Sequence, residues 1–224
     1  MASSSNTEKA YDVFLSFRGV DLRKSFVGHL YQALNQKRIH TFRDNEELKK
    51  GEQISPVLMK AIGESCIAII VFSYDYTSSR WCLEEVAKIM ECREPKNLTV
   101  LPVFYKVDPR EVKQGRNSYR RALNKHESKL GKNSEKVMRW KKALFAASNL
   151  SGWHLNDGDE SKLIQGIVKF ISTQLRRTPL HVADYPVGID SQVVKLRGML
   201  NLESTDDVLM MGLWGQGYRK DNVG

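Results

Sequence analysis

The sequence predicts an α/β fold with a doubly wound parallel sheet. Over the first 176 residues, short apolar segments alternate with longer amphipathic segments that could return the chain between parallel strands. The apolar segments are nearly continuous runs, which is typical of strands buried on both faces. Such folds bind ligands at the carboxyl ends of their strands, so we expect a functional site there.

The first predicted strand, YDVFLSF at residues 11–17, lies between the polar leader 1–10 and Gly19. Apolar residues then recur at helical spacing over 22–37, which predicts an amphipathic helix. A second strand, IHTF, is expected at 39–42. The alternation of strand and helix begins with these three elements.

The middle of the chain continues the alternation. Ser55 is a predicted N-cap, and Pro56 fits the first position of the helix that follows. The apolar run CIAIIVF at 66–72 predicts the third strand, and LTVLPVFY at 98–105 predicts the fourth. A helix at 78–92 is expected to connect them.

The sheet domain is predicted to end in helices. The segment Asp108-Pro109-Arg110-Glu111 has the form of a capping box with proline in the first turn, so we interpret it as structural. Further helices are expected at 117–130, 135–150 and 160–175, which closes the domain at residue 176. Residues 177–190 carry two prolines and little periodicity, so they are predicted to form a linker.

The helix at 78–92 carries two adjacent glutamates. Successive helical residues point about 100° apart, so the two carboxylates face different directions. Glu84 lies four residues before Lys88, which predicts an ordinary solvated face. Glu85 lies four residues after Trp81 and four before Ile89, on the side away from the predicted core stripe. The core stripe consists of Leu83, Val86, Ala87 and Met90.

Two interpretations of Glu85 remain open from this pattern. If strand ends and loops cover its face, Glu85 becomes a carboxylate in an apolar cleft, and its pKa is expected to be raised. Alternatively, Trp81 packs on a neighbouring loop and Glu85 binds a lysine. The first interpretation predicts an enzyme, and the second predicts an interaction module.

Composition argues against several classes of protein. The three cysteines, Cys66, Cys82 and Cys92, lack C-x-x-C spacing, and the five histidines lack metal-ligand spacing, so we expect no disulfide framework and no metal site. Cys82 is expected to be structural. The leader lacks an apolar signal region, and no apolar run approaches the ~20 residues of a membrane span, so a cytoplasmic or nuclear protein is expected. The net charge of +9 favours anionic partners.

Several long motifs occur in order and resemble one family. They are YDVFLSFRGVDLRKSFVGHLYQAL, IHTFRDNEELKKGEQISPVLMKAI, SSRWCLEEVAKI, VLPVFYKVDPREVKQ and LSGWHL. Together they resemble the TIR (Toll/interleukin receptor-like) domain of plant intracellular immune receptors, over about residues 10–175. The resemblance implies a flavodoxin-like sheet of five parallel strands with helices on both faces, the fifth strand lying near GWHL.

The resemblance also implies an activity. TIR domains of this kind cleave NAD+ between nicotinamide and ribose, yielding ADP-ribose or its cyclic and variant forms, and NAD+ is a substrate, so no cofactor is implied. The catalytic glutamate of the family's tryptophan-cysteine-leucine-x-glutamate motif corresponds to Glu85. The pocket would be lined by Phe17, Arg18, Gly19 and Trp81, although a structural pair between Arg18 and Asp21 is an equal alternative.

The resemblance further implies self-association. The loop at 43–54 matches a loop that completes the site between protomers, and Gly28 and His29 match a contact surface on the first helix. The implied partners are further copies of the chain and other TIR proteins. No binding to a membrane is implied, and binding to nucleic acid is left open. The family usually has serine before this histidine and an acid at the position of Val20, so these contacts could be weaker here.

The last segment, 191–224, resembles the start of an NB-ARC-like nucleotide-binding domain. A phosphate-binding loop needs G-x-x-x-x-G-K-[ST], but Gly217 is followed by Tyr218 and Arg219, so we expect no ATP binding and an unfolded stub of a truncated product. Protection from hydrogen exchange over 180–224 would contradict this expectation.

Three functions are therefore weighed. The first is an NAD+-cleaving enzyme that triggers plant defence and cell death on self-association. The second is a non-catalytic TIR adaptor or decoy, which would keep signalling after loss of Glu85. The third is a synthetase of cyclic nucleotides from nucleic acid, whose first sign would be a steep salt dependence of nucleic-acid binding.

Overall fold

The computed structural model describes residues 9–43, 56–131, 134–156 and 158–177. The five strands are β1 (Tyr11–Ser16), β2 (Thr41–Arg43), β3 (Ser65–Phe72), β4 (Thr99–Tyr105) and β5 (Trp153–Leu155). The helices before β4 are α1 (Val20–Lys24), α2 (Phe26–Gln36), α3 (Pro56–Gly63), the 3-10 helix η1 (Tyr76–Ser78) and α4 (Arg80–Cys92). The helices after β4 are α5 (Pro109–Gln114), α6 (Asn117–Leu130), α7 (Glu135–Ser148) and α8 (Glu160–Arg177).

The five strands form one parallel sheet in the order β2-β1-β3-β4-β5. This is the flavodoxin-like order, so the predicted fold class is confirmed. The chain runs from β1 outward to β2 and then returns past β1 to β3, so the strand order reverses between β1 and β3. Ser16 pairs with Ile70 at this point of the sheet. In folds of this class, a ligand site is expected at the carboxyl ends of those two strands.

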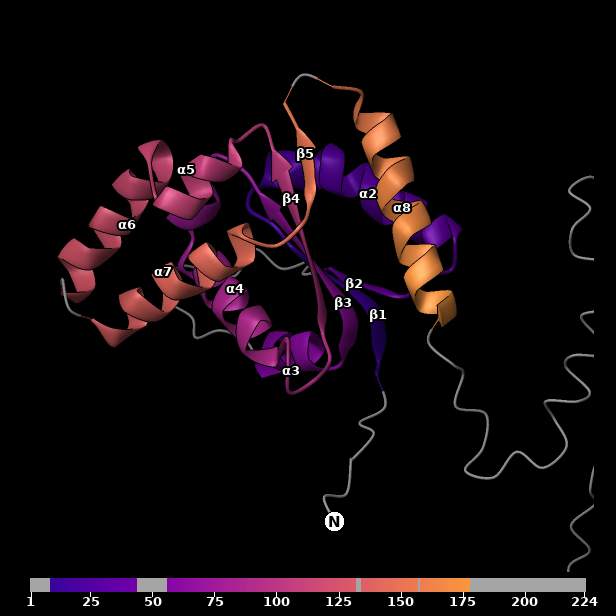
Figure 1. Cartoon of the computed structure of the whole chain (residues 1–224), viewed down its shortest axis with the longest axis horizontal. Helices are drawn as coiled ribbons and strands as arrows, with labels where there is room; N and C mark the ends of the chain where they lie inside the picture. The colour runs from indigo at the N-terminus through magenta and orange to yellow at the C-terminus, as the bar shows by residue number, and fades with distance from the viewer. Residues whose placement is uncertain (1–8, 44–55, 132–133, 157, 178–224) are drawn as a thin grey trace, which may run out of the picture. The chain divides into compact units, whose positions relative to one another are not determined.

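Helices cover both faces of the sheet (Figure 1). Helices α2 and α8 lie on one face, and α3, α4 and α7 lie on the other. Alternate residues of β1 divide between the two cores, because Val13 and Leu15 pack with α2 and α8 while Phe14 packs with α3 and α4. Burial of both faces explains why the central strands read as continuous apolar runs.

The predicted helix at 22–37 is two helices, because the chain leaves the helical conformation at Ser25. The α2 helix restarts there, with His29 N donating to Ser25 O at 2.9 Å. Leu22 and Phe26 flank the break and face the same core, so the apolar pattern runs through it unchanged. Periodicity alone therefore gives no sign of the break.

One of the two predicted helix caps lies within the described residues. Asp108 Oδ1 accepts a hydrogen bond from Arg110 N at 2.7 Å, and Pro109 opens α5, so this segment is structural as predicted. Pro56 opens α3, while its predicted N-cap, Ser55, lies outside the described residues. The predicted linker at 177–190 begins one residue too early, because Arg177 is still the last residue of α8; residues 178–190 and the segment 191–224 lie outside the described residues.

Candidate functional site

The candidate site is assembled where β1 ends and α4 begins. Ser16 is the last residue of β1 and is fully buried. Helix α4 begins after Ser79, whose Oγ accepts from Cys82 N at 3.3 Å. This cap fixes the first turn of α4, and Glu85 follows one turn later with 7% of its surface exposed.

A chain of short hydrogen bonds holds the Glu85 carboxylate. Ser16 Oγ donates to Glu85 Oε2 at 2.5 Å and lies 2.8 Å from Tyr76 Oη. Because the Ser16 proton is donated to Glu85, the single proton of Tyr76 Oη serves both Ser16 Oγ and Cys82 O, which lies 3.1 Å away. Strand β1, the connection after β3 and helix α4 thus meet at one buried carboxylate whose orientation is fixed by neighbouring hydroxyls.

Burial keeps the neighbouring acids neutral. Desolvation raises the pKa of Tyr76 well above its ordinary value, and the charges of Cys82 and Glu85 add to that effect. Desolvation and the Glu85 charge also raise the pKa of the Cys82 thiol, which lies 3.4 Å from Phe17 O. A thiol with a raised pKa is a poor nucleophile, which agrees with the structural role expected for Cys82.

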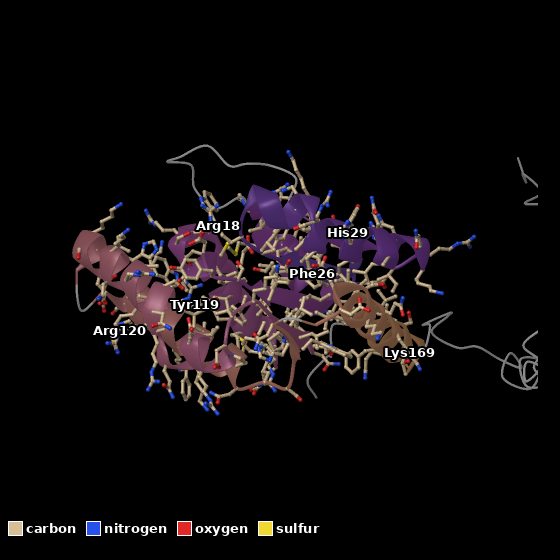
Figure 2. All side chains as sticks on the ribbon, turned by 90° about the horizontal axis from the view of Figure 1, so that it is seen from above. Arg18, Phe26, His29, Tyr119, Arg120 and Lys169 are labelled. Atoms are coloured by element: carbon tan, nitrogen blue, oxygen red, sulfur yellow. The ribbon has the colours of Figure 1, made fainter. Side chains whose placement is uncertain are left out.

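The residues predicted to line the pocket follow β1 or open α4. Arg18 is exposed, and its Nε donates to Ser78 Oγ at 3.4 Å; the side chain of Asp21, its alternative partner, lies outside those described. Figure 2 shows Arg18 on the upper surface of the molecule in that view. Phe17 is half-buried, with its carbonyl against Cys82.

The two remaining predicted lining residues lie on the same segments. Gly19 has φ +100°, a backbone conformation that side chains rarely adopt, so glycine is required at this turn. Trp81 is half-buried in the first turn of α4. Phe17, Arg18 and Gly19 thus come directly after Ser16, and Trp81 lies one helical turn before Glu85. Whether these residues bind substrate stays a prediction.

The prediction of a solvated Glu84 is wrong. Glu84 is 5% exposed and lies between α4 and α7, where Lys136 Nζ is 2.7 Å from Oε1 and Arg139 Nη1 is 2.7 Å from Oε2. Burial acts to raise the pKa of Glu84, but hydrogen bonds and charges from Lys136 and Arg139 outweigh it and lower the pKa overall. Lys88, its predicted neighbour, instead lies 3.9 Å from Glu91.

The prediction that Glu85 lies on the side of the helix away from the core is also wrong. Ile89, one turn beyond Glu85, is fully buried and belongs to the same core as Val86, so this side of α4 does not face away from the protein. Glu85 is buried because it meets the end of β1. Its neighbours Ser16 and Tyr76 were not predicted from the sequence; a lone hydroxyl at the end of the apolar run YDVFLSF was the available signal.

The predicted interface residues lie on α2, apart from the carboxylate. His29 is 61% exposed, and its Nδ1 lies 3.4 Å from Glu160 Oε1 at the start of α8 (Figure 2). A Cβ atom added at Gly28 would lie 2.6 Å from Arg23 O, which is too close for any side chain without movement of the α1–α2 turn. The glycine that replaces serine here is therefore required by the close approach of α1 to α2.

Other predicted features concern metals, membranes and one loop. Among the described residues, no group of three or more His, Cys, Asp or Glu is placed to hold a metal ion. Within the same ranges, no helix is long and apolar enough to cross a bilayer. The loop predicted to complete the site between protomers lies, after Arg43, outside the described residues.

Comparisons with known proteins agree on one family. The family model for the TIR domain matches residues 10–188. The chain is 45% identical over 219 residues to TMV resistance protein N of Nicotiana glutinosa, covering 97% of this chain and 19% of that protein. It is 46% identical over 222 residues to disease resistance protein RPV1 of Vitis rotundifolia, covering 96% of this chain and 16% of that protein.

A solved structure extends the match to the fold. The TIR domains of the activated Roq1 resistosome, which directly recognises the pathogen effector XopQ, are 54% identical to this chain with a TM-score of 0.67. The alignment covers 72% of this chain and 99% of that one. The chain spans less than a fifth of the length of the two curated relatives. Sequence, fold and family model together show that this chain belongs to the TIR domain family and is homologous to plant disease resistance proteins.

Proposed function

We propose that this chain is an NAD+ nucleosidase that breaks the bond between nicotinamide and ribose. The observation that carries the proposal is the Glu85 carboxylate, which is buried at the carboxyl ends of β1 and β3 and accepts a 2.5 Å hydrogen bond from Ser16. A fixed carboxylate with little solvent around it is suited to stabilise positive charge that develops in a transition state. The nearby Arg18 supplies a cation for a phosphate-bearing substrate.

The chemistry of NAD+ explains how one carboxylate can suffice. Ordinary glycosidases need a second carboxylic acid to protonate the leaving oxygen. Nicotinamide instead leaves as a neutral amine, because the electron pair of the broken C1′–N bond returns to the positively charged pyridinium nitrogen. The ribose carbon is left with oxocarbenium character next to the carboxylate. Water then adds at that carbon and releases a proton, or another nucleophile of the same molecule closes a cyclic product.

Ser16 is assigned a positioning role in this reaction. Its hydroxyl donates to Oε2 of Glu85 and so holds the carboxylate in one orientation. Ser16 is itself held against Tyr76, whose raised pKa keeps it a neutral hydrogen-bond partner. The pair therefore fixes the carboxylate before substrate binds, as preorganised catalysis requires.

The relatives support a role in plant immunity. Two of them are named for resistance, and the solved Roq1 TIR domains belong to an activated resistosome. We infer that NAD+ cleavage by this chain depends on self-association with further copies or with other TIR proteins, and that it triggers defence and cell death. His29 and Gly28 on α2 are the expected contact residues.

Product analysis tests the proposal. The full chain at high concentration is incubated with NAD+, and nicotinamide and ADP-ribose species are separated by chromatography. Replacing Glu85 with glutamine keeps its volume and removes its charge, and should lower nicotinamide release by about 10²–10³-fold. Glu91→Gln is the matched control, because Glu91 is an exposed glutamate of the same helix and should be replaceable without loss.

Three outcomes would contradict the enzymatic proposal. Equal release by the wild type and Glu85→Gln would exclude the carboxylate from the chemistry. Cell-death signalling that survives in a folded Glu85→Gln protein would favour the non-catalytic adaptor. Consumption of nucleic acid with no nicotinamide release would favour the synthetase.

A further inference from the structure

A cavity of about 560 Å³ lies between helix α6 and the connection from β3 to α4. Two hydrogen bonds join these two segments beside the cavity: Tyr119 Oη donates to Ser73 O at 2.9 Å, and His126 Nε2 lies 3.0 Å from Thr77 O. Ser78, which lines the cavity, also accepts the hydrogen bond from Arg18. The two segments that line the cavity are therefore bonded to each other, and the cavity adjoins the candidate site through Ser78.

The charged residues that line this cavity are mostly basic. Arg121, Lys125 and Lys129 follow one another at four-residue intervals along α6, so they lie on one face of the helix. None of the three forms an ion pair with a carboxylate among the described residues, where Arg121 instead donates to Tyr74 Oη. Asp75 is the single acid in the lining.

A neighbouring cavity of about 750 Å³ provides a contrast. It shares Tyr74 and Arg121 and contains three more cations, but two carboxylates, Asp108 and Glu111, line it as well. Its cations are therefore partly neutralised by the protein itself. The two linings have the same formal net charge of +2, but the smaller cavity reaches it with three cations and one carboxylate, whereas the larger has four cations and two carboxylates.

A buried hydroxyl points to a ligand independently of the charge. Ser118, in the first turn of α6, lines the smaller cavity and is 8% exposed, yet its Oγ has no hydrogen-bond partner in the described part of the chain. Buried polar groups almost always have a partner, so each exception needs an explanation. The start of a helix also carries partial positive charge from its free amide groups, which favours an anion near Ser118.

We propose that this cavity binds the pyrophosphate group of a small organic ligand. Arg121 and Lys129 are eight residues apart, so the basic row extends for about 12 Å along α6, which is longer than a single phosphate group. The cavity volume falls in the range of small-molecule sites, about 300–1,000 Å³. Ser118 hydrogen-bonds one phosphate oxygen, and the basic row neutralises the rest.

His126 lines the cavity, so its pKa should change when a ligand binds there. Desolvation lowers the pKa of His126, and the positive charges of Arg80 and Lys129 lower it further, whereas the hydrogen bond that His126 donates to Thr77 O raises it. An anion bound beside Lys129 offsets that positive charge. Binding should therefore raise the pKa of His126, which NMR titration of its imidazole resonances measures.

Calorimetric titration of the full chain tests the proposal, with inorganic pyrophosphate and ADP-ribose as separate ligands. The Glu85→Gln background removes turnover, so binding is read independently of the proposed function. We expect both ligands to bind and to raise the pKa of His126. Lys125→Gln and Ser118→Ala should each weaken binding by about tenfold, because each removes one hydrogen bond or charge to a charged ligand. Lys142→Gln, an exposed change on α7, is the matched control and should leave binding unchanged.

Several results would overturn the proposal. Absence of binding by both ligands, with no change at His126, removes the site. Equal weakening by Lys125→Gln and Lys142→Gln shows diffuse attraction to a basic protein. Binding of a single-stranded oligonucleotide without binding of either pyrophosphate ligand shows a nucleic-acid surface instead.

Discussion

Replacing Glu84 with glutamine tests whether this residue supports the fold. Glu84 is 5% exposed, while the Lys136 and Arg139 side chains that contact it are 41% and 40% exposed. Hydrogen bonds to charged groups contribute about 1.5–3 kcal/mol each, and exposure of both cations to water reduces this, so we expect a loss of about 2 kcal/mol. At about 2–4 °C per kcal/mol for a domain of this size, Tm should fall by roughly 4–8 °C.

The effect should depend on pH in a defined direction. The pKa of folded Glu84 is lowered, so its contribution to stability is present above the ordinary value of 4.5 and is lost as pH falls through the folded pKa. Differential scanning calorimetry should therefore show the full difference between wild type and Glu84→Gln at pH 7 and a smaller one in acid.

A matched control and an activity assay complete this test. Glu91→Gln is the control, because Glu91 shares Arg139 but is exposed, and its Tm should change little. Nicotinamide release by Glu84→Gln, measured well below its Tm, should stay within a few-fold of wild type. A Tm change no larger than that of the control would refute the structural role. Complete loss of release by a folded Glu84→Gln protein would show that the two glutamates are not separable.

Three further predictions concern residues around the site. Ser16→Ala should lower nicotinamide release by about 10- to 100-fold in steady-state assays, because Glu85 loses the donor that fixes it, and an unchanged rate would remove Ser16 from the mechanism. The pKa of buried His126 is lowered, so the free energy of unfolding should fall as pH drops below the ordinary value of 6.5. His126→Gln should remove this pH dependence in urea titrations. If the pH dependence persists in the variant, another group causes it. Gly28→Ser should cost about 1–3 kcal/mol by the same titration, because its Cβ meets Arg23 O at 2.6 Å, whereas an unchanged midpoint would mean that the α1–α2 turn shifts freely.

Much of the fold could be predicted because continuous apolar runs, which form the strands, alternate along the chain with amphipathic segments, which form the helices. The helix predicted at 117–130 is α6 itself, and the third strand begins one residue before the predicted 66–72. The short strand β5 has only three residues, too few for a pattern of alternation, and the family resemblance located it instead.

The surroundings of Glu85 could not be predicted in the same way. Ser16 lies 69 residues earlier in the chain, and it reaches the carboxylate only because β1 and β3 are adjacent in the sheet and α4 follows β3. Likewise, Arg139 meets Glu84 from 55 residues later. The sequence of a single helix does not specify which strand end or neighbouring helix will cover it.

The burial of two consecutive glutamates follows from the position of α4 between two layers. One side of α4 packs on the sheet, where Leu83 and Val86 are fully buried, and another packs on α7, where Val137 and Trp140 are equally buried (Figure 1). A helix enclosed in this way has no solvated face near its middle, so a charge on either side needs a partner. Cations of α7 neutralise Glu84, and the Ser16 hydroxyl orients Glu85. Because Leu83 and Val86 also hold α4 on the sheet, loss of the Glu84 ion pairs should lower the stability of the domain while the folded protein keeps Glu85 in place, so the roles of the two carboxylates can be separated by experiment.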